Sequence, residues 1–119
     1  MMKTRSKTFI YAAEQEWQPA GDGVHRMIMG YDGQVTVALV KFDKPGGLGA
    51  PHTHYHSQTS YVASGRFEFT IGDETREVAA GDGVYMEPDQ YHGCRCLEPG
   101  IVVDCFTPMR ADFVEKLRK

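Results

Sequence analysis

Three histidines and a glutamine recur at every second position in the stretch PHTHYHSQTSYVASG: His52, His54, His56 and Gln58. Alternate side chains of a β-strand share a face, so the imidazoles of His52 and His54 are expected to enter one cavity, about 7 Å apart along the chain. Neutral imidazole nitrogens bind divalent metal ions, and Gln58 offers an amide oxygen. Together with His92, which follows a later turn, these groups predict a metal site. A solvated histidine-rich loop is the alternative.

The predicted ligand set of three imidazoles and one amide carries no charge. A bound ion therefore keeps its full positive charge, which favours Lewis-acid chemistry on a substrate oxygen or a water over oxygen-activating redox chemistry. The set suits one divalent ion of Ni, Zn, Mn, Fe or Co and does not select among them.

Short strand-like runs, separated by turns rich in glycine and proline, must position these residues. Two of the runs, VHRMIMG and VTVALVKF, are expected to form a hairpin. Only the end of the chain has a helical pattern, with Thr107 as N-cap, Pro108 at the first helical position, and an apolar stripe of Phe113, Val114 and Leu117. The pattern predicts an all-β sandwich or barrel with one short C-terminal helix.

A chain of 119 residues is expected to form one domain, residues 1–119, with an N-terminal extension at 1–16 and a C-terminal helical tail at 107–119. A net charge of −3 provides no basic field for nucleic acid or for a membrane surface. No apolar run approaches the roughly 20 residues of a membrane span. The early apolar stretch FIYAA ends at Glu14, which is too short for an export signal.

The three cysteines are an odd number without a CxxC pair, which fits a reducing compartment and predicts a cytoplasmic location. Cys94 and Cys96 share a strand face with His92 by alternation. A thiolate beside the histidines is one hypothesis for them, and simple filling of the interior is the other.

The spacing around the histidines resembles the first cupin motif, which is Gly, five residues, HxH, three or four residues, Glu, six residues, Gly. Here five residues separate Gly46 from His52, and six residues separate Gln58 from Gly65. The second cupin motif is Gly, five residues, PxG, two residues, His, three residues, Asn. Residues 81–96 keep that spacing, with three substitutions at the Pro, Gly and Asn positions: Glu87, Asp89 and Cys96.

This resemblance implies a single cupin double-stranded β-helix barrel, jelly-roll-like, with the metal held inside by the residues at four positions: His52, His54, Gln58 and His92. The cupin pattern also places a bend after the HxH pair. His56 is therefore expected to leave the ligand face, either into solvent or behind the ligands.

Most of the chain from Trp17 onward is similar to the pectin-degradation cupins of the KdgF type, small metalloproteins that linearise 4,5-unsaturated uronates. That group typically has glutamine as its fourth ligand, as at Gln58. The tail DCFTPMR matches the family pattern D-x-F-x-P-x-R, whose Asp, Phe and Arg are implicated in the active site. The resemblance thus assigns Asp104 to proton transfer, Arg110 to the substrate carboxylate, and Phe106 to an apolar wall for the sugar ring.

The resemblance implies metal-dependent ring opening of an unsaturated uronic acid, from pectin or alginate, to a linear 5-keto-4-deoxyuronate. It also implies a homodimer, as in other small cupins. The alternatives are a non-enzymatic metal-containing cupin that binds a sugar or sugar acid, and a small metal-dependent oxygenase. Outside the motifs, His25 and Arg26 are expected at an interface or surface, and three tyrosines are expected to pack in the barrel: Tyr61, Tyr85 and Tyr91.

Overall fold

The structure is a computed structural model that describes residues 5–47, 52–115 and 117. Its first element is a 3-10 turn, η1, at Ala12–Glu14. The other elements follow in chain order: β1 Gln18–Gly21, β2 Val24–Tyr31, β3 Thr36–Phe42, β4 Gly46–Gly47, β5 Ser57–Val62, β6 Arg66–Ile71, β7 Glu74–Ala79, β8 Gly83–Met86, β9 His92–Glu98, β10 Gly100–Thr107 and α1 Ala111–Glu115.

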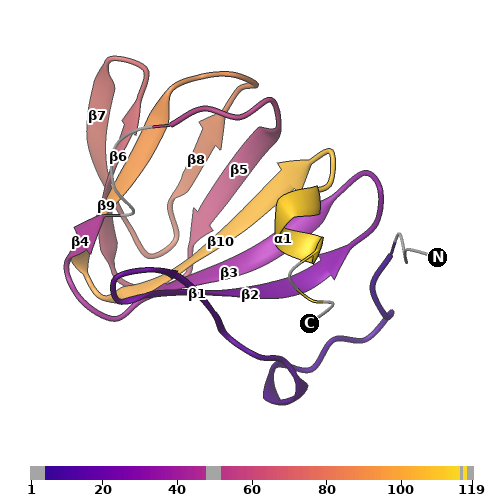
Figure 1. The fold of residues 1–119 in the computed structure, drawn as a ribbon. Coiled ribbons are helices and arrows are strands. Elements are labelled where there is room, and N and C mark those ends of the chain that lie inside the picture. The colour runs from indigo at the N-terminus through magenta and orange to yellow at the C-terminus, as the bar shows by residue number, and fades with distance from the viewer. Residues whose placement is uncertain (1–4, 48–51, 116, 118–119) are drawn as a thin grey trace.

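The strands form two antiparallel sheets that face each other (Figure 1). The six-stranded sheet has the order β1-β2-β3-β10-β5-β8, and the four-stranded sheet has the order β4-β9-β6-β7. The chain crosses between the sheets repeatedly, so the HxH segment and β9 come together although they are far apart in sequence. The predicted all-β fold with a short C-terminal helix is confirmed.

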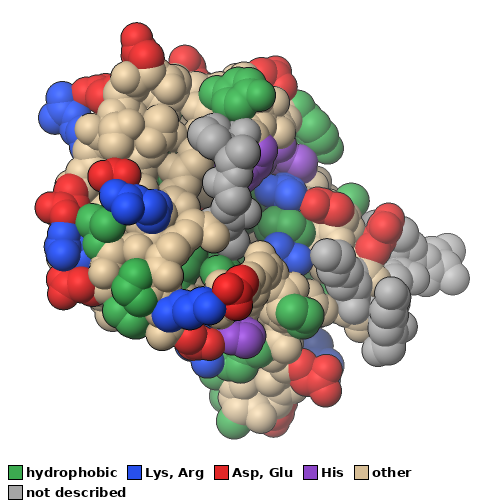
Figure 2. Space-filling model, turned by 60° about the vertical axis from the view of Figure 1, so that its left-hand side comes forward, with side chains coloured by type: hydrophobic (Ala, Val, Ile, Leu, Met, Phe, Trp, Pro, Cys, Tyr) green, Lys and Arg blue, Asp and Glu red, His purple; other side chains and the backbone are tan. Residues whose placement is uncertain are grey.

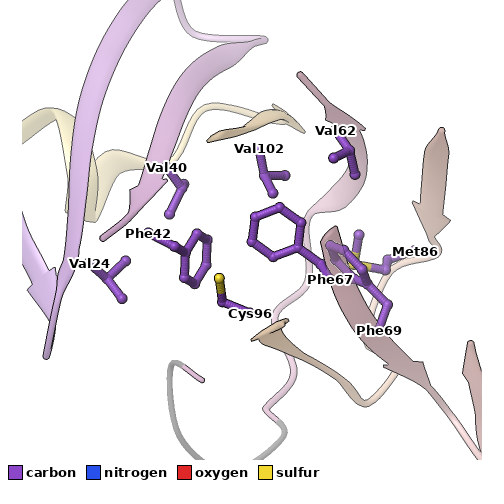
Figure 3. Packing of buried hydrophobic residues seen from close by; sticks show 9 residues of the cluster. All are labelled: Val24, Val40, Phe42, Val62, Phe67, Phe69, Met86, Cys96 and Val102. Carbon is purple, nitrogen blue, oxygen red and sulfur yellow. The ribbon is translucent and has the colours of Figure 1, made fainter. Parts of the chain in front are cut away.

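The hydrophobic core fills the space between the two sheets. Burial alternates strictly along β3, where Thr36, Ala38, Val40 and Phe42 point inward, as the period of a half-buried strand requires. Side chains from both sheets meet in the middle (Figure 3), and the rings of Phe42 and Phe67 pack edge to face with centroids 5.0 Å apart. This core holds the barrel together without help from the histidines.

Two turn positions explain the cupin-like spacing. Gly65 has φ +85°, and a Cβ there would lie 2.6 Å from the carbonyl oxygen of Glu98, so only glycine fits. Asp89 occupies the position that the second motif gives to glycine, and it adopts φ 62°, a conformation that Asp tolerates better than most residues. Its backbone N–H donates to the carbonyl of His54 at 2.8 Å, which ties the second motif to the first.

The C-terminal helix begins later than the sequence predicts. Thr107 still belongs to β10, where it pairs with Ser57, so it does not cap a helix. The chain turns only at Arg110, whose N–H donates to Thr36 Oγ1 at 2.9 Å. Its carbonyl accepts the N–H groups of Phe113 and Val114. Strand pairing thus extends the sheet through the position that local propensity assigns to the helix.

Two further expectations concern the loop before the histidines and the membrane. Within the predicted loop KPGGLGAP, residues 46 and 47 form the short strand β4, and residues 48–51 lie outside the described residues. Across the described ranges, no helix is long and apolar enough to cross a membrane.

Candidate metal centre and active site

The register of the six-stranded sheet brings the candidate residues of two distant segments together. On β10, Phe106 lies opposite Gln58 of β5, and Asp104 lies opposite Ser60. On its other side, Phe106 faces Thr36 of β3. Because opposite residues in an antiparallel pair point to the same face, these side chains form adjacent rows on the inner face of the sheet.

The three predicted histidine ligands converge from two segments. His52 and His92 form an isolated antiparallel bridge, in which each backbone N–H donates to the other residue's carbonyl at 2.9 Å. One ring nitrogen from each of His52, His54 and His92 lies within 4.8 Å of the others. The expectation that the HxH pair forms a strand is wrong, because only His52 is paired, residues 53 and 54 belong to no strand, and the chain bends at residues 55 and 56.

Backbone carbonyls set the orientation of two of the imidazoles. His92 Nδ1 lies 2.9 Å from the carbonyl oxygen of Gln90, and His54 Nδ1 lies 3.2 Å from that of His56. A carbonyl only accepts, so each Nδ1 carries the proton and each Nε2 presents a lone pair. Burial, which is the largest cause, lowers the pKa of His92 and keeps its ring neutral.

The residues present fit a divalent cation. His54 has an acceptor at each ring nitrogen, since Gln58 Oε1 lies 2.9 Å from Nε2 while the His56 carbonyl faces Nδ1. A neutral imidazole has one N–H and can satisfy only one of these acceptors. A cation beside Nε2 and Oε1 would be coordinated by both lone pairs. The cluster of His52, His54 and His92 in this fold therefore suits a divalent metal.

Asp104 sits behind this cluster and is joined to Gln58 through one hydroxyl. Ser60 Oγ donates to Asp104 Oδ1 at 2.6 Å, and Gln58 Nε2 donates to Ser60 Oγ at 3.1 Å. The second bond turns the amide oxygen of Gln58 toward His54. Burial raises the pKa of Asp104 to about 6, although the hydrogen bond from Ser60 opposes the shift. The carboxyl therefore exchanges its proton close to neutral pH.

Arg110 projects over two aromatic rings at the edge of the same space. Its guanidinium carbon lies 4.8 Å from the centroid of the Phe106 ring and 3.9 Å from that of Phe113. Nε and Nη2 donate to the two carboxylate oxygens of Asp112 at 3.0 and 2.8 Å. The side chain is only 14% exposed. Arg110 is thus held in a fixed orientation in the absence of any ligand.

All of the candidate site residues except His54, which contacts Gln58 beside the cavity, line one cavity of about 230 Å³. The candidate site residues that line it are His52, Gln58, His92, Asp104, Phe106 and Arg110. Apolar walls come from both sheets and from Phe113 of α1. Figure 2 shows histidine and basic side chains gathered with hydrophobic ones on one face of the molecule. A concave, largely apolar cavity with a few convergent polar groups is the usual form of a small-molecule site.

A family model described as the cupin domain matches residues 38–106. The chain belongs to the cupin family. It is 39% identical over 103 residues, 85% of this chain and 93% of the relative, to the pectin degradation protein KdgF of Dickeya dadantii (strain 3937). The predicted resemblance to the KdgF-type cupins is thereby confirmed.

Solved cupin structures superpose closely on this cupin. An RmlC-like cupin from Shewanella frigidimarina NCIMB 400 matches with a TM-score of 0.87 and 32% identity, covering 92% of this chain and 98% of that one. KdgF from Halomonas sp. matches with a TM-score of 0.84 and 34% identity, covering 91% and 99%. These matches confirm the cupin fold.

His56 leaves the ligand cluster, as the bend implies, but it does not enter solvent. The residue is 6% exposed, its ring stacks on Tyr55 with centroids 4.1 Å apart, and Nε2 lies 3.2 Å from the carbonyl of Met109. Burial lowers the pKa of His56. In this cupin it packs behind His54 and links the histidine segment to the C-terminal segment.

The two cysteines of β9 differ in their surroundings. Cys94 lines the cavity, whereas Cys96 is 1% exposed and packs in the core. Burial raises the pKa of both thiols. They remain protonated near neutral pH, so the hypothesis of a thiolate beside the histidines is not supported, and Cys96 fills the interior.

Sequence reasoning missed Arg26, which it assigned to a surface. Arg26 lines the cavity, while its neighbour His25 faces outward and pairs with Asp43 at 2.6 Å. Alternation along β2, with Val24 and Ile28 both buried, was the signal that could have placed Arg26 inside.

The tyrosines predicted to pack in the barrel are instead largely exposed: Tyr61 52%, Tyr85 63% and Tyr91 60%.

Proposed function

We propose that this cupin binds one divalent metal ion and linearises 4,5-unsaturated uronates, such as those released from pectin or alginate, to 5-keto-4-deoxyuronate. The observation that carries the proposal is one cavity lined by His52 and His92 of the metal-suited cluster, by a carboxyl with a pKa of about 6, and by a fixed guanidinium. The similarity to a pectin degradation protein supports the same conclusion.

Four residues would hold the ion: His52, His54, Gln58 and His92. When bound, the ion supplies a Lewis acid for a substrate oxygen. Gln58 contributes an uncharged oxygen, and its orientation is set by the hydrogen bond to Ser60. The hydrogen bonds from Nδ1 of His54 and His92 to backbone carbonyls keep both rings in the tautomer that a metal requires.

Asp104 is the group that moves protons. The net reaction is an isomerisation, in which the bond between C1 and the ring oxygen breaks, the O1 hydroxyl loses its proton, C4 gains one, and C5 becomes a ketone. A carboxyl with a pKa of about 6 accepts and returns a proton readily near neutral pH. Its place on the cavity wall, one row from Gln58, puts it beside the ligand cluster.

Arg110 and Phe106 orient the sugar. The guanidinium of Arg110 keeps donors beyond the two that Asp112 occupies, and these suit a planar carboxylate. Phe106 is 3% exposed and lines the cavity, so it offers an apolar surface for one face of the ring.

The decisive experiment follows the absorbance of the unsaturated uronate in the presence of purified protein, together with oxygen uptake and metal content. Loss of absorbance without oxygen uptake, from protein with about one metal ion per chain, supports the proposal. Oxygen consumption with turnover would instead indicate the oxygenase. Tight binding of uronate without turnover would indicate the non-enzymatic sugar-acid cupin.

We also propose that residues 1–119 form one domain and that two copies pair in solution in the cytoplasm. Light scattering on the purified protein tests the pairing, and a mass of one chain would contradict it. Cell fractionation tests the location.

A further inference from the structure

Arg26 is a cation on the wall of the cavity, and the roles proposed above do not include it. It comes from β2, the second strand of the six-stranded sheet, between the buried residues Val24 and Ile28. In the register of the sheet it faces Val40, which in turn faces Val102 of β10. The guanidinium therefore lies on the same inner face as Asp104, one row away.

Arg26 has no carboxylate partner in the part of the chain that the structure describes. Its Nε is buried and makes no hydrogen bond to any described residue. Arg110 differs in this respect, because Asp112 accepts two hydrogen bonds from it. A half-buried guanidinium without an ion pair is costly unless an anion or water reaches it.

The two arginines contact the same aromatic ring. The guanidinium carbon of Arg26 lies 3.7 Å from the centroid of the Phe113 ring, and that of Arg110 lies 3.9 Å from it. Burial, followed by the positive charge of Arg110, lowers the pKa of Arg26. The negative charges of Asp112 and Asp104 oppose this shift, but among the described residues neither carboxylate forms an ion pair with Arg26, whereas Asp112 pairs with Arg110.

We propose that Arg26 is a second substrate-binding residue, which together with Arg110 receives the carboxylate of the uronate. This inference rests on the proposed function, because it deepens the account of that site. The unsatisfied Nε of Arg26, its place on the cavity wall and its shared contact with Arg110 through Phe113 all point to an anion beside the two guanidinium groups.

The test measures binding of a saturated uronate, galacturonate, and of neutral galactose to the metal-loaded protein by calorimetry. Galacturonate has no C4–C5 double bond and is therefore not a substrate for the proposed reaction, so the measurement does not depend on turnover. Arg26→Gln should weaken galacturonate binding by about tenfold to a hundredfold and leave galactose binding unchanged. Arg26→Lys, which keeps the charge but loses the planar fork, should restore part of the affinity.

Arg95→Gln is the matched control, because Arg95 is an exposed arginine of β9 that pairs with Glu68. It should bind galacturonate as the parent does. Turnover of the unsaturated uronate is measured in parallel, where Arg26→Gln should raise KM by a similar factor with little change in kcat. If the parent binds galacturonate but turns over no unsaturated uronate, the proposed function is wrong. The comparison of galacturonate affinity between the parent and Arg26→Gln still decides whether Arg26 binds the carboxylate. Equal galacturonate affinity of the parent and Arg26→Gln, or no galacturonate binding by the parent, would overturn the inference.

Discussion

Ser60 Oγ lies 2.6 Å from Asp104 Oδ1 and donates its only proton to that carboxylate. The hydroxyl can then accept but not donate at Gln58, whose amide Nε2 supplies the hydrogen bond at 3.1 Å. A glutamine at this position thus serves two neighbours, because its nitrogen satisfies Ser60 and its oxygen faces His54. Glutamate has no proton to give Ser60 when ionised.

Gln58→Glu should therefore slow turnover while keeping the metal. The added negative charge holds a cation at least as tightly but weakens it as a Lewis acid, and the new carboxylate competes with Asp104 for the proton of Ser60. We expect equal or tighter metal binding, lower kcat, and a pH profile moved to higher pH, since a second negative charge raises the pKa of Asp104. Faster turnover in this variant would contradict the charge argument.

Replacing any of the three histidine ligands with alanine should remove the metal and spare the fold. The hydrophobic core does not include His52, His54 or His92, so each variant should keep the circular dichroism of the parent. Elemental analysis should find well below one ion per chain. His25→Ala, on the outward face of β2, is the control and should retain full metal content. Parent protein that binds no metal on titration would show that the ligand set is wrong.

Asp104→Asn should lower turnover at normal metal content, and it should also change how stability depends on pH. The folded pKa of about 6 lies above the value of about 3.9 for an unfolded chain. A carboxyl whose pKa is raised by folding contributes its full stabilisation at pH values below its unfolded-state pKa. That stabilisation is lost as the pH rises through its folded-state pKa. Asparagine does not ionise, so the metal-free variant should gain Tm over the metal-free parent at about pH 7 but much less at about pH 4.

Asp73→Asn provides the comparison for that measurement, because Asp73 is exposed in the turn between β6 and β7. Its Tm difference from the parent should be similar at both pH values. If Asp104→Asn behaves in the same way, the carboxyl titrates at an ordinary pKa and the assignment as proton carrier loses its physical basis.

Arg110→Ala should reduce kcat/KM for unsaturated uronate by about tenfold to a hundredfold, the equivalent of a charge-assisted contact of about 1.5–3 kcal/mol. A neutral analogue without the carboxylate should be processed equally poorly by the variant and the parent. Parent-like kinetics with the uronate would return Arg110 to a purely structural role, in which it stacks on Phe106 and Phe113.

The alternation of side chains along single strands was enough to predict much of the fold and part of the candidate site. Alternation along a strand was enough to put Asp104 and Phe106 on one face, and motif spacing brought His92 to the HxH pair. The hydroxyl of Ser60 was not anticipated, since its role depends on the register between β5 and β10, which no single strand reveals. The same holds for Arg26, whose role depends on a cavity that is lined by residues of both sheets and of α1.

The two local errors have a common cause. A strand for the HxH segment and a helix start at Pro108 both followed from local preference, and tertiary pairing decided otherwise. His54 lies outside any strand and its carbonyl accepts the N–H of Asp89, and the pairing of Thr107 with Ser57 keeps the end of β10 in the sheet. Such contacts join residues that are far apart in sequence, so short windows do not contain them.

The short helix α1 contributes to the substrate side of the cavity and supplies none of the proposed metal ligands. Its Phe113 completes the cavity wall, and Asp112 fixes Arg110, while the histidine cluster depends on other segments. A gene can therefore change the shape and charge of the substrate entrance through a handful of adjacent codons, without altering those that encode the ligands. Related cupins that keep the same ligands are expected to diverge first in this peptide when they acquire new substrates.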